Sequence, residues 1–315
     1  MNATHRGLLA RIADLYYNAE LSQAEIGQRL DISRVKVYRL LKEAREVGVV
    51  RIHIDWPLER APALERALAE RFGLREVRVA ADAEGNATPA QVGRLAARLL
   101  EDVLHDGATL AICLGRATRE AVRAIAAGPG RERVRVAQAV GSIPSSMQAF
   151  DSATIGRELA AQLGGEVLYL NAPLMADSAE SAAVIRRQPQ VAHTLSAARR
   201  ADVALVGIGS LASSGARLVE GGFLQPQDIA ALGVAGVVGD MAGRMFTANG
   251  SFDFPHNQRV IGVDLDDLRS IPFTLGVVCG VDRATAVRGA LRTRALRALC
   301  TDEATAQRIL SEEAA

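Results

Sequence analysis

The chain of 315 residues is 49% hydrophobic and 23% charged, and its formal net charge is +1. This is the composition of an ordinary globular protein, and it excludes one that attracts nucleic acid through a basic charge spread over the whole surface. A nucleic-acid partner must therefore meet a local basic patch, and the length predicts two or three domains.

No metal, disulfide or membrane motif is visible. The three cysteines lie far apart (Cys113, Cys279, Cys300) and the five histidines show no ligand spacing, so we expect no metal and no cofactor. The longest apolar stretch, residues 229–239, is too short and too rich in glycine to span a bilayer. No signal peptide is recognisable at the N-terminus. We therefore expect a cytoplasmic protein without a membrane partner.

The first fifty residues predict three helices. Apolar residues at helical spacing fill 7–19. Ser22 and Glu25 form a capping box that opens a second helix, and Ser33 caps a third that ends near Gly48. The alternating sequence VVRIHID at 49–55 then predicts a short strand, or wing.

The second and third of these helices predict a DNA-reading helix-turn-helix. Such a motif needs a buried seam, a small residue at the helix crossing and a polar outer face. Gly27 is the small residue, and Asp31 stands in the turn, where glycine is usual. Both lysines of the chain lie in the third helix. The predicted seam consists of Ile26, Leu30, Ile32, Val37 and Leu40.

Two groups of residues are candidates for DNA contacts. We expect base-edge contacts from Arg34, Lys36, Tyr38 and Arg39. We expect phosphate contacts from Gln23, Ser33, Lys42 and Arg51. The alternatives are a merely solvated basic helix face and, for Tyr38, packing on the flank of its helix.

From residue 58 onward, short apolar strands alternate with helices. Continuous apolar strands need cover on both faces, so the pattern predicts a doubly wound α/β domain with a mostly parallel sheet. A hairpin turning at Asn249-Gly250 interrupts the alternation. A helix at 63–72 carries an apolar stripe that serves either as a seam between subunits or as packing onto its own domain. The predicted strands are 76–80, 109–114, 134–140, 166–171, 202–208, 259–264, 273–279 and one near 297–300.

Several long motifs in this order resemble the SorC family of sugar-responsive transcriptional regulators. They are ADVALVGIGSL at 201–211, GVVGDMAGRMFTANG at 236–250, RVIGVDLDDLRSIP at 259–272 and CGVDRATAVRGAL at 279–291. The resemblance implies a winged helix-turn-helix domain at 1–56 and a sugar-binding and oligomerisation domain at 57–315 that folds like sugar-phosphate isomerases. It implies double-stranded operator DNA, a small carbohydrate effector and a homo-oligomer, dimer or tetramer, as partners.

The resemblance also implies an effector site at the carboxyl ends of the strands. The family's G-R-T loop is Gly115-Arg116-Ala117 here, followed by Thr118; it suits an anion, or is only a tight turn. Asp240 and Arg244 fall in the family's G-D-x-x-G-R segment, where they bind the sugar, pair with each other or cap the hairpin. The candidate effector residues are Gly115, Arg116, Thr118, Ser142, Ser145, Gln148, Gly209, Asp240, Arg244 and Arg283.

Departures from the family pattern bear on the effector. Arg283 replaces the usual lysine, Cys279 replaces the first of two glycines, and Ala117 replaces the loop threonine. These losses slightly favour a free sugar alcohol over a sugar phosphate, and both remain open. The alternative function is an isomerase- or deaminase-like enzyme. Against it, no lysine follows residue 42, which excludes Schiff-base chemistry in the large domain, and Leu211 and Ala212 stand where deaminases of this fold carry an acid and a histidine.

Overall fold

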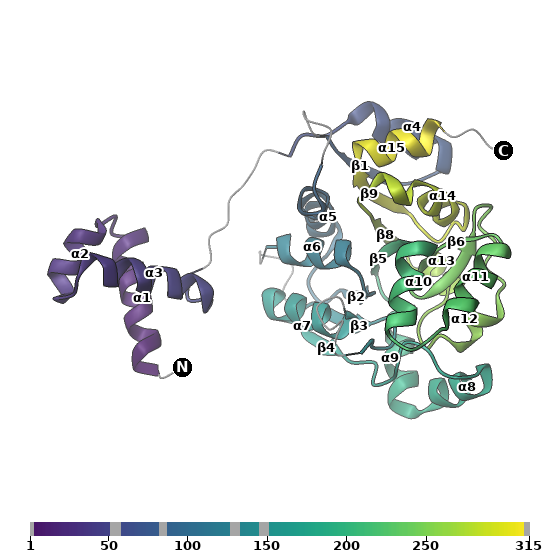
Figure 1. Cartoon of the computed structure of the whole chain (residues 1–315), viewed down its shortest axis with the longest axis horizontal. Helices are drawn as coiled ribbons and strands as arrows, with labels where there is room; N and C mark the ends of the chain where they lie inside the picture. Colours follow the sequence, from purple (N-terminus) through teal and green to yellow (C-terminus); the bar gives the residue numbers. More distant parts are fainter. Residues whose placement is uncertain (1–2, 51–57, 82–86, 127–132, 145–150, 312–315) are drawn as a thin grey trace. The chain divides into compact units, whose positions relative to one another are not determined.

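The computed structural model describes residues 3–50, 58–81, 87–126, 133–144 and 151–311 (Figure 1). The chain divides into two compact units, Met1–Pro57 and Leu58–Ala315. Each unit has its own hydrophobic core. The expected wing strand falls mainly on residues outside the described part, as does Arg51.

The first unit contains three helices, α1 (Ala3–Tyr17), α2 (Gln23–Leu30) and α3 (Arg34–Glu46). The capping box predicted at the start of α2 is confirmed, because Glu25 N donates to Ser22 Oγ and Ser22 N donates to the Glu25 carboxylate. Ser33 caps α3 by accepting from Lys36 N at 3.2 Å. The helices bury a compact core of Leu9, Ile12, Ala13, Ile26, Val37, Leu40, Leu41 and Ala44.

The tight turn between α2 and α3 depends on two residues. A Cβ at Gly27 would lie 2.7 Å from the Ile32 carbonyl oxygen, so only glycine lets the turn pack this closely on α2. Asp31 takes the left-handed conformation with φ of 52°, which aspartate tolerates better than most residues. The structure therefore confirms Gly27 as the small residue at the helix crossing and Asp31 as the residue of the turn.

The second unit is built on a nine-stranded sheet. Seven of its strands lie in the order β1-β9-β8-β5-β2-β3-β4, and every neighbouring pair in this order is parallel. The end of β5 continues into a small antiparallel extension formed with β6 and β7. The strands are β1 (Glu76–Ala80), β2 (Thr109–Ile112), β3 (Arg135–Gln138), β4 (Glu166–Leu168), β5 (Val203–Ser210), β6 (Val237–Met241), β7 (Arg244–Thr247), β8 (Phe273–Val277) and β9 (Ala298–Asp302).

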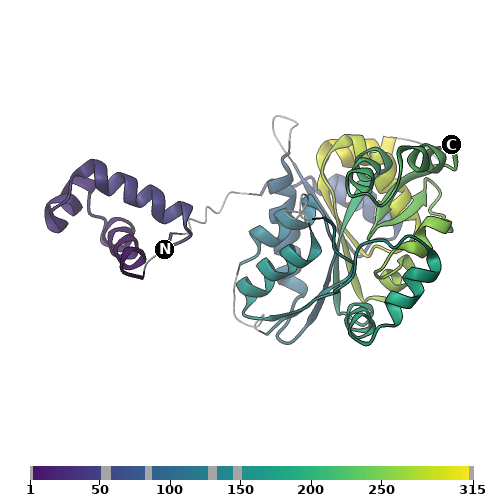
Figure 2. The ribbon, with the colours of Figure 1, turned by 60° about the horizontal axis from the view of Figure 1, so that its bottom comes forward.

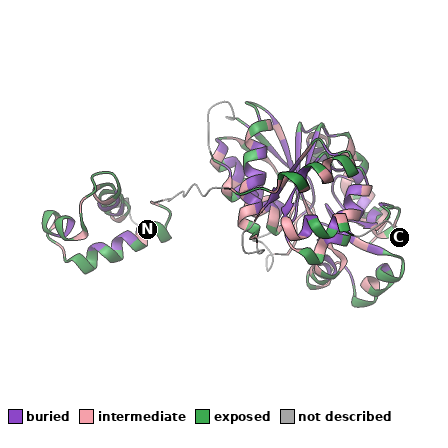
Figure 3. Cartoon of the chain, turned by 90° about the horizontal axis from the view of Figure 1, so that it is seen from above, coloured by how far each residue is buried: buried purple, intermediate pink, exposed green. Residues whose placement is uncertain are grey.

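Helices cover both faces of this sheet (Figure 2). One face carries α5 (Pro89–Val103), α6 (Arg116–Ala124) and α7 (Ser152–Leu163), which share one apolar core. The opposite face carries a second core. Buried residues accordingly run along the strands between the two helical layers (Figure 3). The helices contributing to the second core are α4 (Pro62–Phe72), α9 (Pro189–Arg199), α10 (Leu211–Glu220), α11 (Pro226–Val234), α13 (Leu265–Ser270), α14 (Ala284–Arg292) and α15 (Glu303–Ser311).

Two predictions about the region after residue 236 are wrong. The β6–β7 hairpin turns at Ala242 and Gly243, with φ of 53° and 74°, and not at Asn249-Gly250. The Asn-Gly pair instead ends β7, where Gly250 N donates to the Thr247 carbonyl. Residues 259–264 form no strand of the sheet; the segment follows α12 (Pro255–Arg259) and makes only isolated bridges. Its apolar residues are buried without continuous strand pairing.

The apolar stripe of α4 packs onto its own domain. Leu68 is fully buried in the core of the sheet, and Leu64 and Phe72 pack partly buried against the same core. The sequence left two uses open for this helix. The structure supports packing onto its own domain rather than a seam between subunits.

Candidate functional site

The outer face of α3 combines cations with exposed apolar and aromatic groups. Tyr38 is 52% exposed and lies outside the hydrophobic core of its unit. Acidic groups of α3 pair locally, Glu43 with His5 at 2.6 Å and Glu46 with Lys42 at 3.8 Å. The exposed residues of α3 are Arg34, Val35, Lys36, Tyr38, Arg39, Lys42, Arg45 and Glu46.

Residues at the amino ends of α2 and α3 complement this face. Ser33 lies exposed at the start of α3 with its hydroxyl accepting a backbone hydrogen bond, and Gln23 is the first residue of α2. Free backbone N–H groups and the positive end of the helix dipole make such positions suitable for a phosphate oxygen. The face therefore has the groups required both for base edges and for the DNA backbone.

The second unit has a polar cleft where β2 and β5 end. From β2 the chain proceeds outward to β3 and β4, and from β5 it proceeds the other way to β8 and β9. Ligands of doubly wound folds bind at such a switch point. The cleft is lined by Leu114, Gly115, Arg116, Ala117, Gly207, Ile208, Gly209, Ser213, Arg217, Asp240, Ala242, Gly243, Val277 and Arg283.

The loop at Gly115 leads from β2 directly into α6. Gly115 has φ of 148°, which disfavours other residues, and it caps α6 without a side-chain hydrogen bond. Thr118 lies fully buried beneath the loop, and its Oγ1 has no hydrogen-bond partner in the described structure. A Cβ at Gly115 would come within 3.2 Å of that oxygen, and a Cβ at Gly207 within 3.4 Å. The two glycines thus keep the floor of the cleft open above the hydroxyl.

Asp240 is held on the opposite side of the cleft by hydrogen bonds from two groups. Its Oδ1 accepts from Ser214 Oγ, and its Oδ2 accepts from Gly243 N at 3.2 Å. Arg217 Nη2 donates to Ser214 Oγ at 3.1 Å and also lines the cleft. Asp240 therefore does cap the hairpin, as the alternative proposed, while the rest of its carboxylate faces the cleft.

Arg283 closes the cleft from the short 3-10 helix Val281–Arg283 after β8. Its Nη1 donates to the Cys279 carbonyl at 2.6 Å. The turn before it is fixed by Asp302, a buried carboxylate that accepts from Gly280 N at 2.8 Å. The cleft thus brings together five predicted residues: Gly115, Arg116, Gly209, Asp240 and Arg283.

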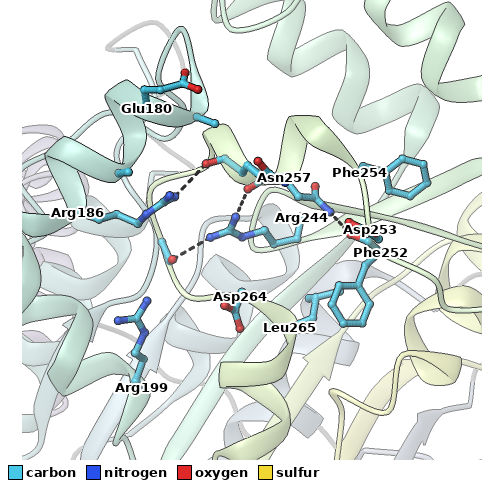
Figure 4. Close-up of a pocket in the computed structure, with 14 residues that line it drawn as sticks. Glu180, Arg186, Arg199, Arg244, Phe252, Asp253, Phe254, Asn257, Asp264 and Leu265 are labelled. Atoms are coloured by element: carbon cyan, nitrogen blue, oxygen red, sulfur yellow. Dashed lines mark hydrogen bonds between the residues drawn. The ribbon is translucent and has the colours of Figure 1, made fainter.

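Arg244 lies elsewhere, so its grouping with Asp240 is wrong. Its guanidinium is buried and donates to the carbonyls of Asn257 and Gly262 (Figure 4). It also donates to the carbonyl of Val263. Burial lowers the pKa of Arg244 to about 10, which still leaves it charged at neutral pH. It forms the floor of a separate open crevice of about 780 Å³ between α8 (Ala179–Arg187), α12 and α13.

This crevice is larger than the cleft, but carboxylates offset the charges of its arginines, whereas Asp240 is the one carboxylate that lines the cleft. Arg186 donates to the carbonyls of Gln258 and Val260, and Arg199 pairs with Asp267 at 2.9 Å. Glu180, Asp253 and Asp264 add three carboxylates to its walls. The cleft at the strand ends is therefore the better candidate for a carbohydrate, even though it is the smaller of the two.

The serine-rich loop after β3 contributes less than expected. The Ser142 hydroxyl belongs to a buried network, in which it accepts from Gln138 Nε2 at 3.1 Å and does not line the cleft. Ser145 and Gln148 lie outside the described residues. Ile143 instead lines an apolar recess beside the cleft, together with Leu114, Leu174, Leu218 and Phe223.

Sequence reasoning missed Ser213, Ser214 and Arg217. All three lie in the first two turns of α10, which follows β5 directly. The signal was present in SLASSGAR, because polar residues at the start of a helix after a central strand face the ligand edge of such sheets.

The structure offers no activated thiol or metal centre among its described residues. Burial raises the pKa of Cys113 to about 12, with the Asp240 charge adding to it, and burial likewise raises that of Cys279 to about 12. Burial also raises the pKa of Cys300. Nowhere in residues 3–50, 58–81, 87–126, 133–144 and 151–311 do three metal-ligating side chains gather, and no helix there is long and apolar enough to cross a membrane.

Known proteins share this organisation. The family model described as "Putative sugar-binding domain" matches residues 57–311. The transcriptional regulator LsrR of Enterobacter sp. (strain 638) is 33% identical over 311 residues, which cover 98% of this chain and 94% of that protein. LsrR of Escherichia coli O9:H4 (strain HS) is 33% identical over 96% of this chain and 94% of its own length. The full-length sorbitol operon regulator SorC of Klebsiella pneumoniae superposes with a TM-score of 0.72 at 28% identity, covering 98% of this chain and all of that one.

Proposed function

The chain belongs to the SorC family of sugar-responsive transcriptional regulators with a sugar-binding domain, and from this premise we propose that α3 reads operator DNA while the cleft at the ends of β2 and β5 binds the effector. Binding of the effector changes the affinity for DNA, so the two units act as reader and sensor of one regulator of carbohydrate metabolism.

The proposal that α3 reads DNA rests on the exposed cations of this helix. Four of its exposed cations are Arg34, Lys36, Arg39 and Lys42, and they lie outside the buried seam that fixes α3 against α1 and α2. In helix-turn-helix proteins this is the helix that enters the major groove. The cations neutralise phosphates or pair with guanine, and the exposed aromatic ring of Tyr38 adds contact area.

For the effector, the charges around the cleft favour an anion. Three arginines line it, Arg116, Arg217 and Arg283, against the single carboxylate of Asp240. Both oxygens of that carboxylate already accept hydrogen bonds, which weakens the case for a neutral polyol held mainly by Asp240. We therefore favour a sugar phosphate over the free sugar alcohol to which the sequence inclined, with Asp240 accepting from sugar hydroxyls and the arginines binding the phosphate.

We also propose a homo-oligomer, because one winged helix covers little DNA and two linked half-sites multiply affinity. The end of α11 (Pro226–Val234) supports a contact surface: Val234 is 92% exposed, and the neighbouring Ala230, Ala231 and Ala235 are exposed as well. Light scattering tests this. A mass equal to the 33.4 kDa of one chain at working concentration rejects the proposal.

An enzyme is the less favoured alternative. The second unit has no lysine to form a Schiff base, and burial raises the pKa of each of its three thiols, so neither lysine nor cysteine offers an activated nucleophile there. We propose a non-catalytic cytoplasmic regulator that returns its ligand unchanged. Recovery of a converted sugar after incubation with the protein rejects this view.

The central experiment uses the full chain. Duplexes are selected from a randomised library, and the affinity of the best duplex is then measured with and without sugars, sugar alcohols and their phosphates. We expect salt-dependent binding to the selected duplex and a change of affinity with one sugar phosphate. Failure to select any duplex rejects DNA reading, whereas selection without any ligand effect rejects the sensor role.

A further inference from the structure

One apolar side chain interrupts the cationic face of α3. Val35 is 60% exposed, more than Tyr38 on the same face, and it belongs to no apolar cluster of the described structure. It is the second residue of the helix, directly after Arg34. Valine is a poor helix former because its branched Cβ restricts the side chain. Nothing in the packing of the first unit explains this residue.

Helical geometry places Val35 at the centre of the outer face. With 3.6 residues per turn, Ala44 lies nine residues and two and a half turns further on, hence on the opposite side, where it is fully buried. Lys42 lies about two turns from Val35 on the same side, and Tyr38 and Arg39 flank that line one turn away. The side chain of Val35 therefore points directly away from the core, between the polar residues expected to touch DNA.

The major groove offers one apolar group, the C5-methyl of thymine, and aliphatic side chains read it by direct contact. Residues in the first turns of a recognition helix are those that reach base edges. We propose that Val35 is a specificity-determining residue that packs on a thymine methyl group in each half-site. This inference rests on the proposed reading of DNA by α3.

The test replaces single thymines by deoxyuridine in a duplex selected by the wild-type protein from a randomised library. Deoxyuridine keeps the base pair and removes only the methyl group. We expect one thymine position per half-site at which the exchange weakens wild-type binding about fourfold, the effect of exposing one methyl group. Val35→Ala should bind the unmodified duplex more weakly and should not distinguish thymine from uracil at that position.

Two controls keep the result specific. Val35→Ala favours the helix, so loss of folding does not explain a weaker complex, and thermal unfolding verifies this. Val47→Ala removes another exposed valine, 40% exposed just after the end of α3, and should respond to uracil as wild type does.

The outcomes separate this inference from the function beneath it. If no duplex is selected, DNA reading by α3 fails and the inference fails with it. If a duplex is selected but no thymine methyl matters, or one matters equally to wild type and Val35→Ala, then Val35 does not read thymine and DNA binding stands without it.

Discussion

The carboxylate of Asp240 occupies the space in which a side chain at Gly209 would lie. The two residues are paired across the antiparallel β5–β6 ladder. A Cβ on Gly209 would come 2.5 Å from Asp240 Oδ1 and 1.9 Å from Ser214 Oγ. The bare backbone of Gly209 thus makes room for the hydrogen bond that holds Asp240 at the cleft.

We expect Gly209→Ala to damage both stability and sensing. The added methyl group must push Ser214 and Asp240 apart, at the cost of about 1–3 kcal/mol that is typical of overpacking. The response of DNA affinity to the effector should be lost, because Asp240 no longer holds its position. Urea unfolding and effector titration measure the two effects separately.

Gly233→Ala is the matched control. Its Cβ would meet only Leu211 Cδ2 at an ordinary 3.6 Å, and it lies within helix α11. We expect unchanged sensing and a stability gain of up to about 1 kcal/mol, as for glycine replaced within a helix. Wild-type stability and sensing in Gly209→Ala would contradict the role assigned to this glycine.

The parts of the fold set by local sequence were predictable. The Ser22–Glu25 capping box and the turn at Asp31 depend on neighbours within a few residues, and both were predicted. The hairpin turn was misplaced because Asn249-Gly250 has the stronger local signal, whereas Ala242 takes its positive φ in the context of the β5–β6–β7 ladder. Tertiary contacts there outweigh local turn preference.

Only those cleft residues could be predicted that lie in a recognisable sequence motif near the end of a strand. Gly115 and Asp240 follow from such motifs, and the structure brings them together. Arg217 was missed because a helical residue seven positions after the end of β5 faces the cleft only through the orientation of α10. Arg244 was misassigned because it neighbours Asp240 in sequence, although β7 directs its side chain to the crevice.

Arg283 and Asp240 should distinguish the charge of the effector. If the effector is phosphorylated, Arg283→Ala should weaken its binding by about 1.5–3 kcal/mol, the contribution of a charge-assisted hydrogen bond. Asp240→Asn should then have the smaller effect. Calorimetric titration of a sugar alcohol and its phosphate against each variant measures this.

Arg187→Ala, on the exposed end of α8 and outside the cleft, serves as the charge-matched control and should bind as wild type does. If the free alcohol binds best and only Asp240→Asn weakens it, the effector is a neutral polyol. Unchanged binding in both cleft variants would place the effector site elsewhere.

Two substitutions in α3 should affect DNA binding differently. Arg39→Ala should cost about 1–3 kcal/mol and relax specificity at one base pair, because arginine reads guanine by paired hydrogen bonds. Lys42→Ala should weaken all sequences alike and lower the salt slope by about one, because it neutralises a phosphate. Fluorescence anisotropy over a range of salt concentrations measures the DNA affinity of each variant and its salt dependence. Wild-type affinity in both variants would reject the docking of α3.

The buried cysteines should make the second unit sensitive to alkali. Burial raises the pKa of Cys113 to about 12, so the folded state keeps a proton that the unfolded state releases above about pH 8.5. The free energy of unfolding should therefore fall as pH rises from about 8.5 towards 12, by up to about 1.4 kcal/mol per pH unit for this thiol. Cys113→Ala should flatten this slope, whereas Val206→Ala, another buried truncation, should destabilise equally at every pH. Parallel slopes in wild type and Cys113→Ala between pH 8.5 and 10.5 would contradict the assignment.

Arg244 should prove to be a structural clamp. Its Nε donates to Val263 O at 3.1 Å and its Nη2 to Gly262 O at 2.9 Å, with Nη1 bonded to the Asn257 carbonyl. Arg244→Met keeps the bulk and leaves three buried carbonyls without this donor, each worth about 1–3 kcal/mol. Because the substitution also removes a buried charge, we expect a net loss of roughly 3 kcal/mol in the free energy of unfolding. At temperatures where the variant is folded, effector affinity should equal that of wild type. If the variant is as stable as wild type but no longer responds to the effector, Arg244 is an effector-binding residue, as its sequence motif first suggested.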